Sequence, residues 1–386
     1  MNRQYLRNIA DIQTGPFGSQ LHKEDYVNNG TPIVTVEHLG NRVFTKQNLP
    51  KVSDKDKVRL TKYVLQKGDI VFSRVGSVDR CSYVDEVHDG WMFSGRCLRV
   101  RPIGDIDPLF LYYFFCLEKT KQFVRNIAVG ATMPSINTKL LGEVEIVYPV
   151  LDVQRKIVKT LSAIDEKIEN NQKINDNLEQ QAQELFSNFY ERATESVPFT
   201  SIIQILGGGT PKTSESSYWN GDIPFFTPKD VGCPYTFMTE KTITEDGLNH
   251  CNSRLYPVNT IFVTARGTVG KVGLSGVPMA MNQSCYALVG KDIEQLLVYF
   301  YTLETVNSLK HKASGAVFDA ITTKDFDYER VMCLSKNDST VFLTIVSPIF
   351  KKILSNCLEN KKLAELRDSL LPKLMSGEID VSSVKI

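Results

Sequence analysis

The chain has 386 residues, 42% of them apolar, and a formal net charge of +1. This composition is typical of two or three globular domains, and it excludes a uniformly basic surface, so any phosphate-binding surface must be a local patch. Neither a run of about 18 apolar residues nor an N-terminal signal sequence is evident, so we expect no membrane partner. The eight cysteines form no C-x-x-C pair and histidine is scarce, which predicts reduced cytoplasmic thiols and no metal site.

The first part of the chain, residues 1–150, is predicted to form a mixed α/β module. Short runs rich in β-branched and aromatic residues predict strands over residues 32–36, 69–74, 97–100 and 143–148. Turns rich in Gly, Asn and Pro separate these runs, and a helical stretch over residues 108–126 interrupts them. The order of the strands in a sheet does not follow from the sequence.

A long helix is predicted next, over residues 151–190. Apolar residues recur four and three positions apart, as in the seam of a coiled coil, and the segment 161–186 contains neither Gly nor Pro. A second segment with the same pattern follows near the end of the chain, over residues 341–386. Both seams become polar at matching positions, which are Asn171, Asn175, Asn356 and Asn360. Buried Asn is costly unless paired and is used to fix register, so these four residues predict that the two helices pair with each other.

The region between the helices, residues 191–340, repeats the first module. The stretch VGATMPSINTKLLGEVEIV, which starts at Val129, matches SGAVFDAITTKDFDYERVM, which starts at Ser314. At nearly the same offset, GDIVFSRVGSVDRC from Gly68 matches NTIFVTARGTVGKV from Asn259. A helical stretch over residues 293–312 corresponds to the one over 108–126. Each half of the chain is therefore a module followed by a long helix.

Chain connectivity favours an antiparallel pairing of the long helices. A helix of about 33 residues is roughly 50 Å long, and an antiparallel pair lets residues 191–340 form a compact domain with neighbouring termini. The predicted fold class is α+β, with two repeated mixed α/β domains, residues 1–150 and 191–340, separated by an antiparallel two-helix coiled coil. In the alternative fold each helix packs only on its own module, but a narrow two-position apolar stripe suits a coiled-coil seam better.

Two similar domains related by a twofold axis suit a split site on double-stranded DNA, whose strands are related in the same way. Arg pairs with guanine, Asn and Gln pair with adenine, and Gly-rich turns bring backbone N–H groups close to phosphates. These residue types meet in TGPFGSQLHKEDY and SRVGSVDR of the first module, and in GGGTPKTSESSYW, TPKD and ARGTVGK of the second. Arg74 and Arg266 lie in aligned segments but out of strict register; in the simpler interpretation these segments only form hairpins. The candidate DNA-binding residues are Ser19, Gln20, His22, Lys23, Thr35, Arg74, Ser77, Arg80, Thr210, Lys212, Thr227, Lys229, Arg266, Thr268 and Lys271.

These stretches, together with the paired long helices, resemble the specificity subunit of type I restriction–modification systems over nearly the whole chain. The resemblance implies that each module is a target-recognition domain that reads one part of a bipartite DNA site. It also implies that the helices dock two modification subunits, that restriction subunits join this core, and that the protein acts in the cytoplasm. The first module has SRVGSVDR in place of the more typical ARGTVGK, so the family pattern fits Arg266 better than Arg74.

The sequence contains no recognisable catalytic motif. It has no N-P-P-[FY] or D-P-P-Y tetrad, no Walker A loop, no G-x-S-x-G and no H-E-x-x-H. We therefore expect a non-catalytic DNA-recognition subunit with no catalytic residues, no cofactor and no metal. Two alternatives remain open at this point: a DNA methyltransferase with built-in target recognition, and a protein-only scaffold.

Overall fold

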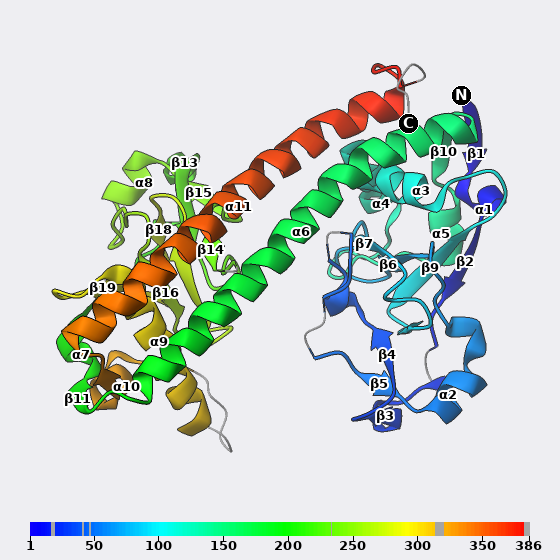
Figure 1. The fold of residues 1–386 in the computed structure, drawn as a ribbon. Helices are drawn as coiled ribbons and strands as arrows, with labels where there is room; N and C mark the ends of the chain where they lie inside the picture. Colours follow the sequence, from blue (N-terminus) through cyan, green and yellow to red (C-terminus); the bar gives the residue numbers. More distant parts are fainter. Residues whose placement is uncertain (17–19, 41, 46–47, 233, 313–319, 382–386) are drawn as a thin grey trace. The chain divides into compact units, whose positions relative to one another are not determined.

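The computed structural model describes residues 1–16, 20–40, 42–45, 48–232, 234–312 and 320–381 (Figure 1). The chain divides into two compact units. Unit 1 consists of Met1–Glu166 together with Leu363–Ile386, and unit 2 consists of Lys167–Lys362. Each unit thus contains one globular module and one segment of each long helix.

Unit 1 contains three sheets and a set of mostly short helices. A two-stranded antiparallel sheet joins β1 (Asn2–Tyr5) to β10 (Glu145–Tyr148). A four-stranded sheet has the order β2 (Ala10–Thr14), β9 (Cys97–Pro102), β6 (Ile70–Ser73), β7 (Cys81–Tyr83), and another has the order β3 (Tyr26–Val27), β5 (Lys51–Val52), β4 (Thr31–Val34), β8 (Met92–Phe93). The helices are α1 (Leu6–Ile9), α2 (Asp54–Arg59), α3 (Pro108–Cys116), α4 (Glu118–Ile127) and α5 (Thr138–Gly142), with 3-10 turns η2 (Lys23–Asp25), η3 (Val36–His38) and η4 (Thr61–Tyr63).

Unit 2 repeats this plan. Strand β11 (Glu195–Pro198) pairs with β20 (Arg330–Cys333). A five-stranded sheet has the order β12 (Ile203–Gly207), β19 (Cys285–Gly290), β16 (Ile261–Thr264), β17 (Val272–Ser275), β14 (Tyr235–Thr236), and a three-stranded sheet has the order β15 (Lys241–Ile243), β13 (Trp219–Phe226), β18 (Ala280–Met281). The helices are α7 (Phe199–Ile202), α8 (Glu245–Asn249), α9 (Gln295–Lys312) and α10 (Thr323–Tyr328), with the 3-10 turn η5 (Ser216–Tyr218).

The shared strand pairings confirm the repeat expected from the sequence. The order β2-β9-β6-β7 in unit 1 recurs as β12-β19-β16-β17 in unit 2, and the parallel pair β4-β8 recurs as β13-β18. The helical stretch expected over residues 108–126 is divided into α3 and α4, because the backbone of Leu117 between them is not helical (φ −60°, ψ 130°). Its counterpart α9 is continuous. The sequence therefore predicted the elements, and the structure supplies their order.

The central strands β6 and β16 are apolar at consecutive positions because each separates two hydrophobic cores. Side chains alternate between the two faces of a strand. Ile70 and Phe72 of β6 join one core, whereas Val71 joins another. In β16, Ile261 likewise joins the core that contains α9, and Phe262 joins the smaller one.

Two long helices, α6 (Leu151–Tyr190) and α11 (Lys336–Ser376), contribute to both units. In unit 1 the start of α6 packs with the end of α11 in the hydrophobic core, through residues that include Leu161 and Leu374. In unit 2 the end of α6 packs with the start of α11, where the Phe186 and Phe342 rings lie 5.5 Å apart. The helices therefore pair antiparallel, and in each unit both also pack on the module. The second helix begins at Lys336, whereas the sequence suggested a start near residue 341.

The four Asn residues of the seam meet in unit 2. Asn171 Nδ2 donates to Asn360 Oδ1 (2.8 Å) and to Glu359 Oε2 (2.8 Å), and Asn356 Nδ2 donates to Asn175 Oδ1 (2.8 Å). Asn171, Asn175 and Asn356 are almost fully buried. Each buried amide thus has a partner on the other helix, as burial of a polar group requires.

Helix α11 contains an unusually apolar stretch. An 18-residue window of α11 has a mean hydropathy of 1.5 and at most two charged residues, so by length and composition alone this helix could cross a membrane. On one face, Phe342, Val346 and Ile353 are buried in the core of unit 2. Elsewhere on the helix, Val341 and Ile345 are 41% and 46% exposed. The apolar composition therefore reflects a buried face and an exposed apolar stripe.

Candidate nucleic-acid interface

A hollow occurs at the same place in each module. The first hollow, of about 530 Å³, lies in unit 1, and the second hollow, of about 510 Å³, lies in unit 2. In both, the lining comes from the end of a parallel strand, from the turn after the central strand, and from the connection that leads into β9 or β19. The polar residues that line the first hollow include Thr35, Arg74, Ser94 and Arg96. Those that line the second include Thr227, Lys229, Arg266, Thr268, Asn282 and Ser284.

The parallel strand ends in a capped turn in each module. The backbone N–H of Thr35 donates to Nδ1 of His38 (3.1 Å), and that of Thr227 donates to Oδ2 of Asp230 (2.8 Å). The Thr227 hydroxyl also hydrogen-bonds Asp230 (2.6 Å). A side chain three residues on thus fixes each Thr at the hollow, as the N3 side chain of a capping box does.

The turn after the central strand carries the two arginines, at neighbouring positions. Gly76 and Gly267 have φ values of 75° and 80°, so both turns use the left-handed backbone that glycine adopts without strain. The carbonyl of Arg74 accepts the N–H of Ile136 (2.9 Å), and the carbonyl of Ala265 accepts that of Ile321 (2.9 Å). The structural counterpart of Arg74 is therefore Ala265, and Arg266 lies one residue further along.

This difference of one residue changes how each arginine is held. Arg74 is half-buried, and its Nη1 donates to the carbonyl of Gly95 (3.0 Å). Arg266 is exposed, and its backbone N–H donates to the carbonyl of Ser284 (3.2 Å). Both side chains line their hollow, so the structure brings Arg74 together with Thr35, and Arg266 together with Thr227, Lys229 and Thr268.

The third side of each hollow was missed by the sequence analysis. The connection Ser94–Arg96 precedes β9, and Asn282–Ser284 precedes β19. Glycine is required opposite each connection, because a Cβ on Gly15 would overlap the carbonyl oxygen of Ser94, and a Cβ on Gly208 that of Asn282. Each connection is followed by a cysteine, Cys97 in unit 1 and Cys285 in unit 2. These matching cysteines were the sequence signal that could have indicated the two connections.

Several predicted residues lie away from the hollows. Gln20 is tied to the module, because its Oε1 accepts the hydroxyl of Tyr63 (2.6 Å) and its carbonyl accepts Nη1 of Arg59 (2.9 Å). His22 is exposed, and its backbone N–H donates to Oδ2 of Asp25 (2.7 Å). Ser19 lies outside the described residues, as does the side chain of Lys23.

The remaining candidates lie near the turns. Ser77 and Arg80 are exposed on the turn that carries Arg74, outside the lining of the first hollow. Thr210 hydrogen-bonds Oε1 of Gln283, next to the connection of unit 2. Lys212 is exposed, and its carbonyl accepts the indole N–H of Trp219 (3.3 Å).

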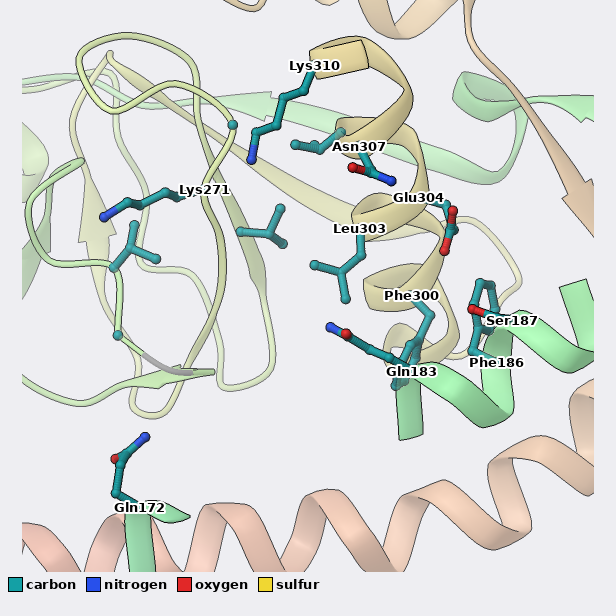
Figure 2. Close-up of a pocket in the computed structure, with 15 residues that line it drawn as sticks. Gln172, Gln183, Phe186, Ser187, Lys271, Phe300, Leu303, Glu304, Asn307 and Lys310 are labelled. Atoms are coloured by element: carbon teal, nitrogen blue, oxygen red, sulfur yellow. The ribbon is translucent and has the colours of Figure 1, made fainter. Parts of the chain in front are cut away.

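Lys271 belongs to a different hollow of unit 2, of about 900 Å³, between the β16–β17 turn, α9 and α6. Figure 2 shows that Lys271 and Lys310 approach it from two sides, with Asn307 and Glu304 on α9 below Lys310. Burial, and then the charge of Lys271, lower the pKa of Lys310. Burial raises the pKa of Glu304. Lys271 and Arg266 were both predicted to bind DNA, and they line two different hollows.

The chemistry of the two hollows is that of a binding surface. Arginines, hydroxyls and amides supply the donors that recognise base edges and phosphates. Burial, and then the charge of Asp25, raise the pKa of Tyr26, which lines the first hollow. Nζ of Lys229 and Oε2 of Glu240 lie 3.7 Å apart, but both side chains are exposed, so their ion pair contributes little to the stability of the fold. Within the described part of the chain, no group of three or more His, Cys, Asp or Glu side chains could hold a metal ion.

Comparison with known proteins identifies the family. The model of the type I restriction modification DNA specificity domain matches twice, over residues 5–180 and 192–366. The specificity subunit of the type I restriction enzyme HindI from Haemophilus influenzae is 25% identical, with 91% of this chain and 95% of that protein aligned. The MjaIX specificity subunit from Methanocaldococcus jannaschii is 22% identical, with 98% of this chain and 93% of that protein aligned.

A solved structure shows the same fold. The S subunit of a type I restriction–modification system from M. genitalium aligns with a TM-score of 0.53 at 17% identity, covering 97% of this chain and 95% of that chain. The two family matches coincide with the two modules and most of the helices that follow them. The chain therefore belongs to the family of type I restriction–modification DNA specificity proteins, and it carries two copies of the family's domain.

Proposed function

We propose that this chain reads a bipartite DNA site, with one half-site recognised by each module, and that it is itself non-catalytic. The observation that carries the proposal is the pair of hollows built at equivalent places in two repeated domains, each with an arginine and a capped threonine. Because the linings differ, the two half-sites should differ in sequence. Among the residues predicted to bind DNA, Thr35, Arg74, Thr227, Lys229, Arg266 and Thr268 are the best supported.

The paired helices set the distance between the half-sites in this proposal and dock two modification subunits, with restriction subunits joining that core. The antiparallel pairing in both units and the Asn layers favour a fixed register. Exposed apolar side chains on these helices support a role in docking, since they are otherwise unexplained in unit 2. They are Ile174, Val341, Ile345 and Leu358. The complex would act on DNA in the cytoplasm, with no membrane partner.

The direct test is to sequence the methylated positions in DNA from cells that carry the complete system. We expect two different half-sites separated by a constant number of unspecified base pairs. The matched control is the same system with Arg74→Ala and Arg266→Ala in the chain, which should lose this pattern. If the wild-type system and binding selection from random duplexes both give no bipartite sequence, the scaffold alternative is correct. Saturable binding of S-adenosylmethionine by the isolated chain would instead favour a methyltransferase.

The spacing role has its own test. Removing one heptad from α6 and the facing heptad from α11 shortens the pair by about 10 Å, at 1.5 Å per residue. The preferred spacer should then shorten by about three base pairs at roughly 3.4 Å each. An unchanged spacer would show that the helices do not set the distance.

A further inference from the structure

We propose that a three-residue connection in each module decides which base that module reads. It is Ser94–Arg96 in unit 1 and Asn282–Ser284 in unit 2, and we call it the reading connection. This inference rests on the proposed function, because it presupposes that the hollows bind DNA. Neither segment was among the residues that the sequence motifs singled out.

The backbone of the reading connection is held in the same way in both modules. The N–H of Ser94 donates to the carbonyl of Val34 (2.8 Å), and the N–H of Asn282 donates to that of Phe226 (2.9 Å). At the other end, the carbonyl of Arg96 accepts the N–H of Arg74 (2.9 Å). The carbonyl of Ser284 accepts the N–H of Ala265 (2.8 Å) in the same way. A site on a backbone fixed at both ends presents its side chains with little freedom, as recognition requires.

The surroundings of the reading connection are shared, but its side chains are not. A capped threonine and a left-handed glycine occur at matching places in both hollows. The connection itself reads Ser-Gly-Arg in unit 1 and Asn-Gln-Ser in unit 2. Two modules with a common frame read different bases through positions that differ. The reading connection is one such stretch: Ser94, Gly95 and Arg96 line the first hollow, Asn282 and Ser284 line the second, and Gln283 lies between these two.

The side chains of unit 1 favour guanine. Arg96 is exposed, the guanidinium of Arg74 donates to the carbonyl of the neighbouring Gly95, and both arginines line the first hollow. Arginine bonds O6 and N7 of guanine with two parallel hydrogen bonds, which no other base accepts in the major groove. We therefore expect a guanine at the position contacted by the first reading connection.

The side chains of unit 2 favour adenine. Gln283 is exposed, and its Oε1 is hydrogen-bonded to the hydroxyl of Thr210, which orients the amide. Asn282 Oδ1 accepts the N–H of Ser284 (3.0 Å), so this amide stabilises the connection itself. The amide of Gln283 can pair with N6 and N7 of adenine. We therefore expect an adenine at the equivalent position of the second half-site.

An exchange of the two connections tests the inference in the complete complex. The first variant is Ser94→Asn with Gly95→Gln and Arg96→Ser, and the second is Asn282→Ser with Gln283→Gly and Ser284→Arg. Selection of random duplexes by each complex should show guanine replaced by adenine in the first half-site of the first variant. The reverse change is expected in the second variant. The preference should shift by about 5- to 150-fold, as expected for one bidentate contact.

The unchanged half-site is the internal control, since its sequence reports a folded and assembled complex. Arg3→Ser removes an exposed arginine of β1 that does not line the first hollow, and it should change no base preference. Gln283→Ala removes an exposed side chain and its hydrogen bond with Thr210, and it should abolish the adenine preference while the first half-site is retained. Half-site sequences that stay the same after both exchanges and after Gln283→Ala would overturn the inference. A wild-type complex that selects no bipartite site would instead overturn the proposed function.

Discussion

The α6–α11 pair has different chemistry in the two units. In unit 1, the buried carboxylate of Asp165 accepts hydrogen bonds from Nη1 of Arg367 (2.8 Å) and from the hydroxyl of Tyr113 (2.5 Å). In the sequence repeat, Asp165 aligns with Phe350 and Arg367 aligns with Ala182, and both of these residues belong to unit 2. Phe350 packs on Phe300 of α9, with their rings 5.5 Å apart. This contact takes the place of the hydrogen bond between Asp165 and Tyr113 of α3 in unit 1. A polar layer in unit 1 thus corresponds to an aromatic layer in unit 2.

The difference shows how one backbone plan accepts two kinds of core. Arg367 interrupts the apolar seam of the second helix, and Asp165 compensates for it from a position beside the seam. Replacing a buried ion pair with apolar residues of similar volume is often neutral or stabilising, so the polar layer contributes more to a specific arrangement than to stability. The aromatic layer gains its stability from buried area and ring packing.

The largest expected effect is the loss of an aromatic ring in unit 2. Phe186→Ala should lower the free energy of unfolding by about 3–5 kcal/mol, because this fully buried ring packs on Phe300, Tyr301 and Phe342. Urea denaturation measures the change. The matched control is Leu371→Ala at the aligned position of unit 1, which should cost less. A larger cost for Leu371→Ala would show that the aromatic layer is not the stronger one.

The polar layer should be sensitive to the loss of one member and tolerant of full replacement. Asp165→Ala should cost about 3 kcal/mol of unfolding free energy, since it leaves Arg367 and Tyr113 without their buried acceptor. Combining Asp165→Phe, Arg367→Ala and Tyr113→Phe copies the apolar layer and should restore most of that loss. Asp368→Ala removes the exposed partner of Arg367 and should change stability by less than about 0.5 kcal/mol. A triple variant as unstable as Asp165→Ala would break the comparison.

The Asn layers should show a similar but smaller pattern. Asn175→Leu should cost about 2 kcal/mol, because it removes the acceptor for the buried Nδ2 of Asn356. The double variant with Asn356→Leu should recover that loss, so a double-mutant cycle should give a coupling energy of about 1–3 kcal/mol. Additive costs would mean that the two amides do not act as a pair.

The smallest effect on folding is expected at the hollows. Arg266→Ala should weaken recognition of one half-site by about 1–3 kcal/mol. Because Arg266 is exposed, the unfolding free energy should change by less than about 0.5 kcal/mol. Competition binding with duplexes mutated in either half-site measures the effect. Lys229→Ala is the control, and it should weaken specific and random duplexes equally. Equal loss on both duplexes for Arg266→Ala would assign Arg266 to a phosphate.

Patterns along the chain predicted the fold better than the site. Strands over residues 69–74 and 97–100 are confirmed as β6 and β9, because apolar runs between turn residues are local signals. The DNA-binding candidates came from motif composition, and part of them gathers at the hollows. Gln20 does not, since its hydrogen bonds hold it within the module, and Ser94–Arg96 was missed because three ordinary residues form no motif.

The sequence by itself determined the repeat, the two long helices and their matched Asn positions, because hydrophobic periodicity and self-similarity are properties of residue order. Only the tertiary structure decided which strands meet, that Ser94–Arg96 lines the same hollow as Arg74, and that Asp165 compensates Arg367. These outcomes depend on contacts between residues far apart in the chain. Packing determines which of these residues meet, and a local sequence pattern does not contain that information.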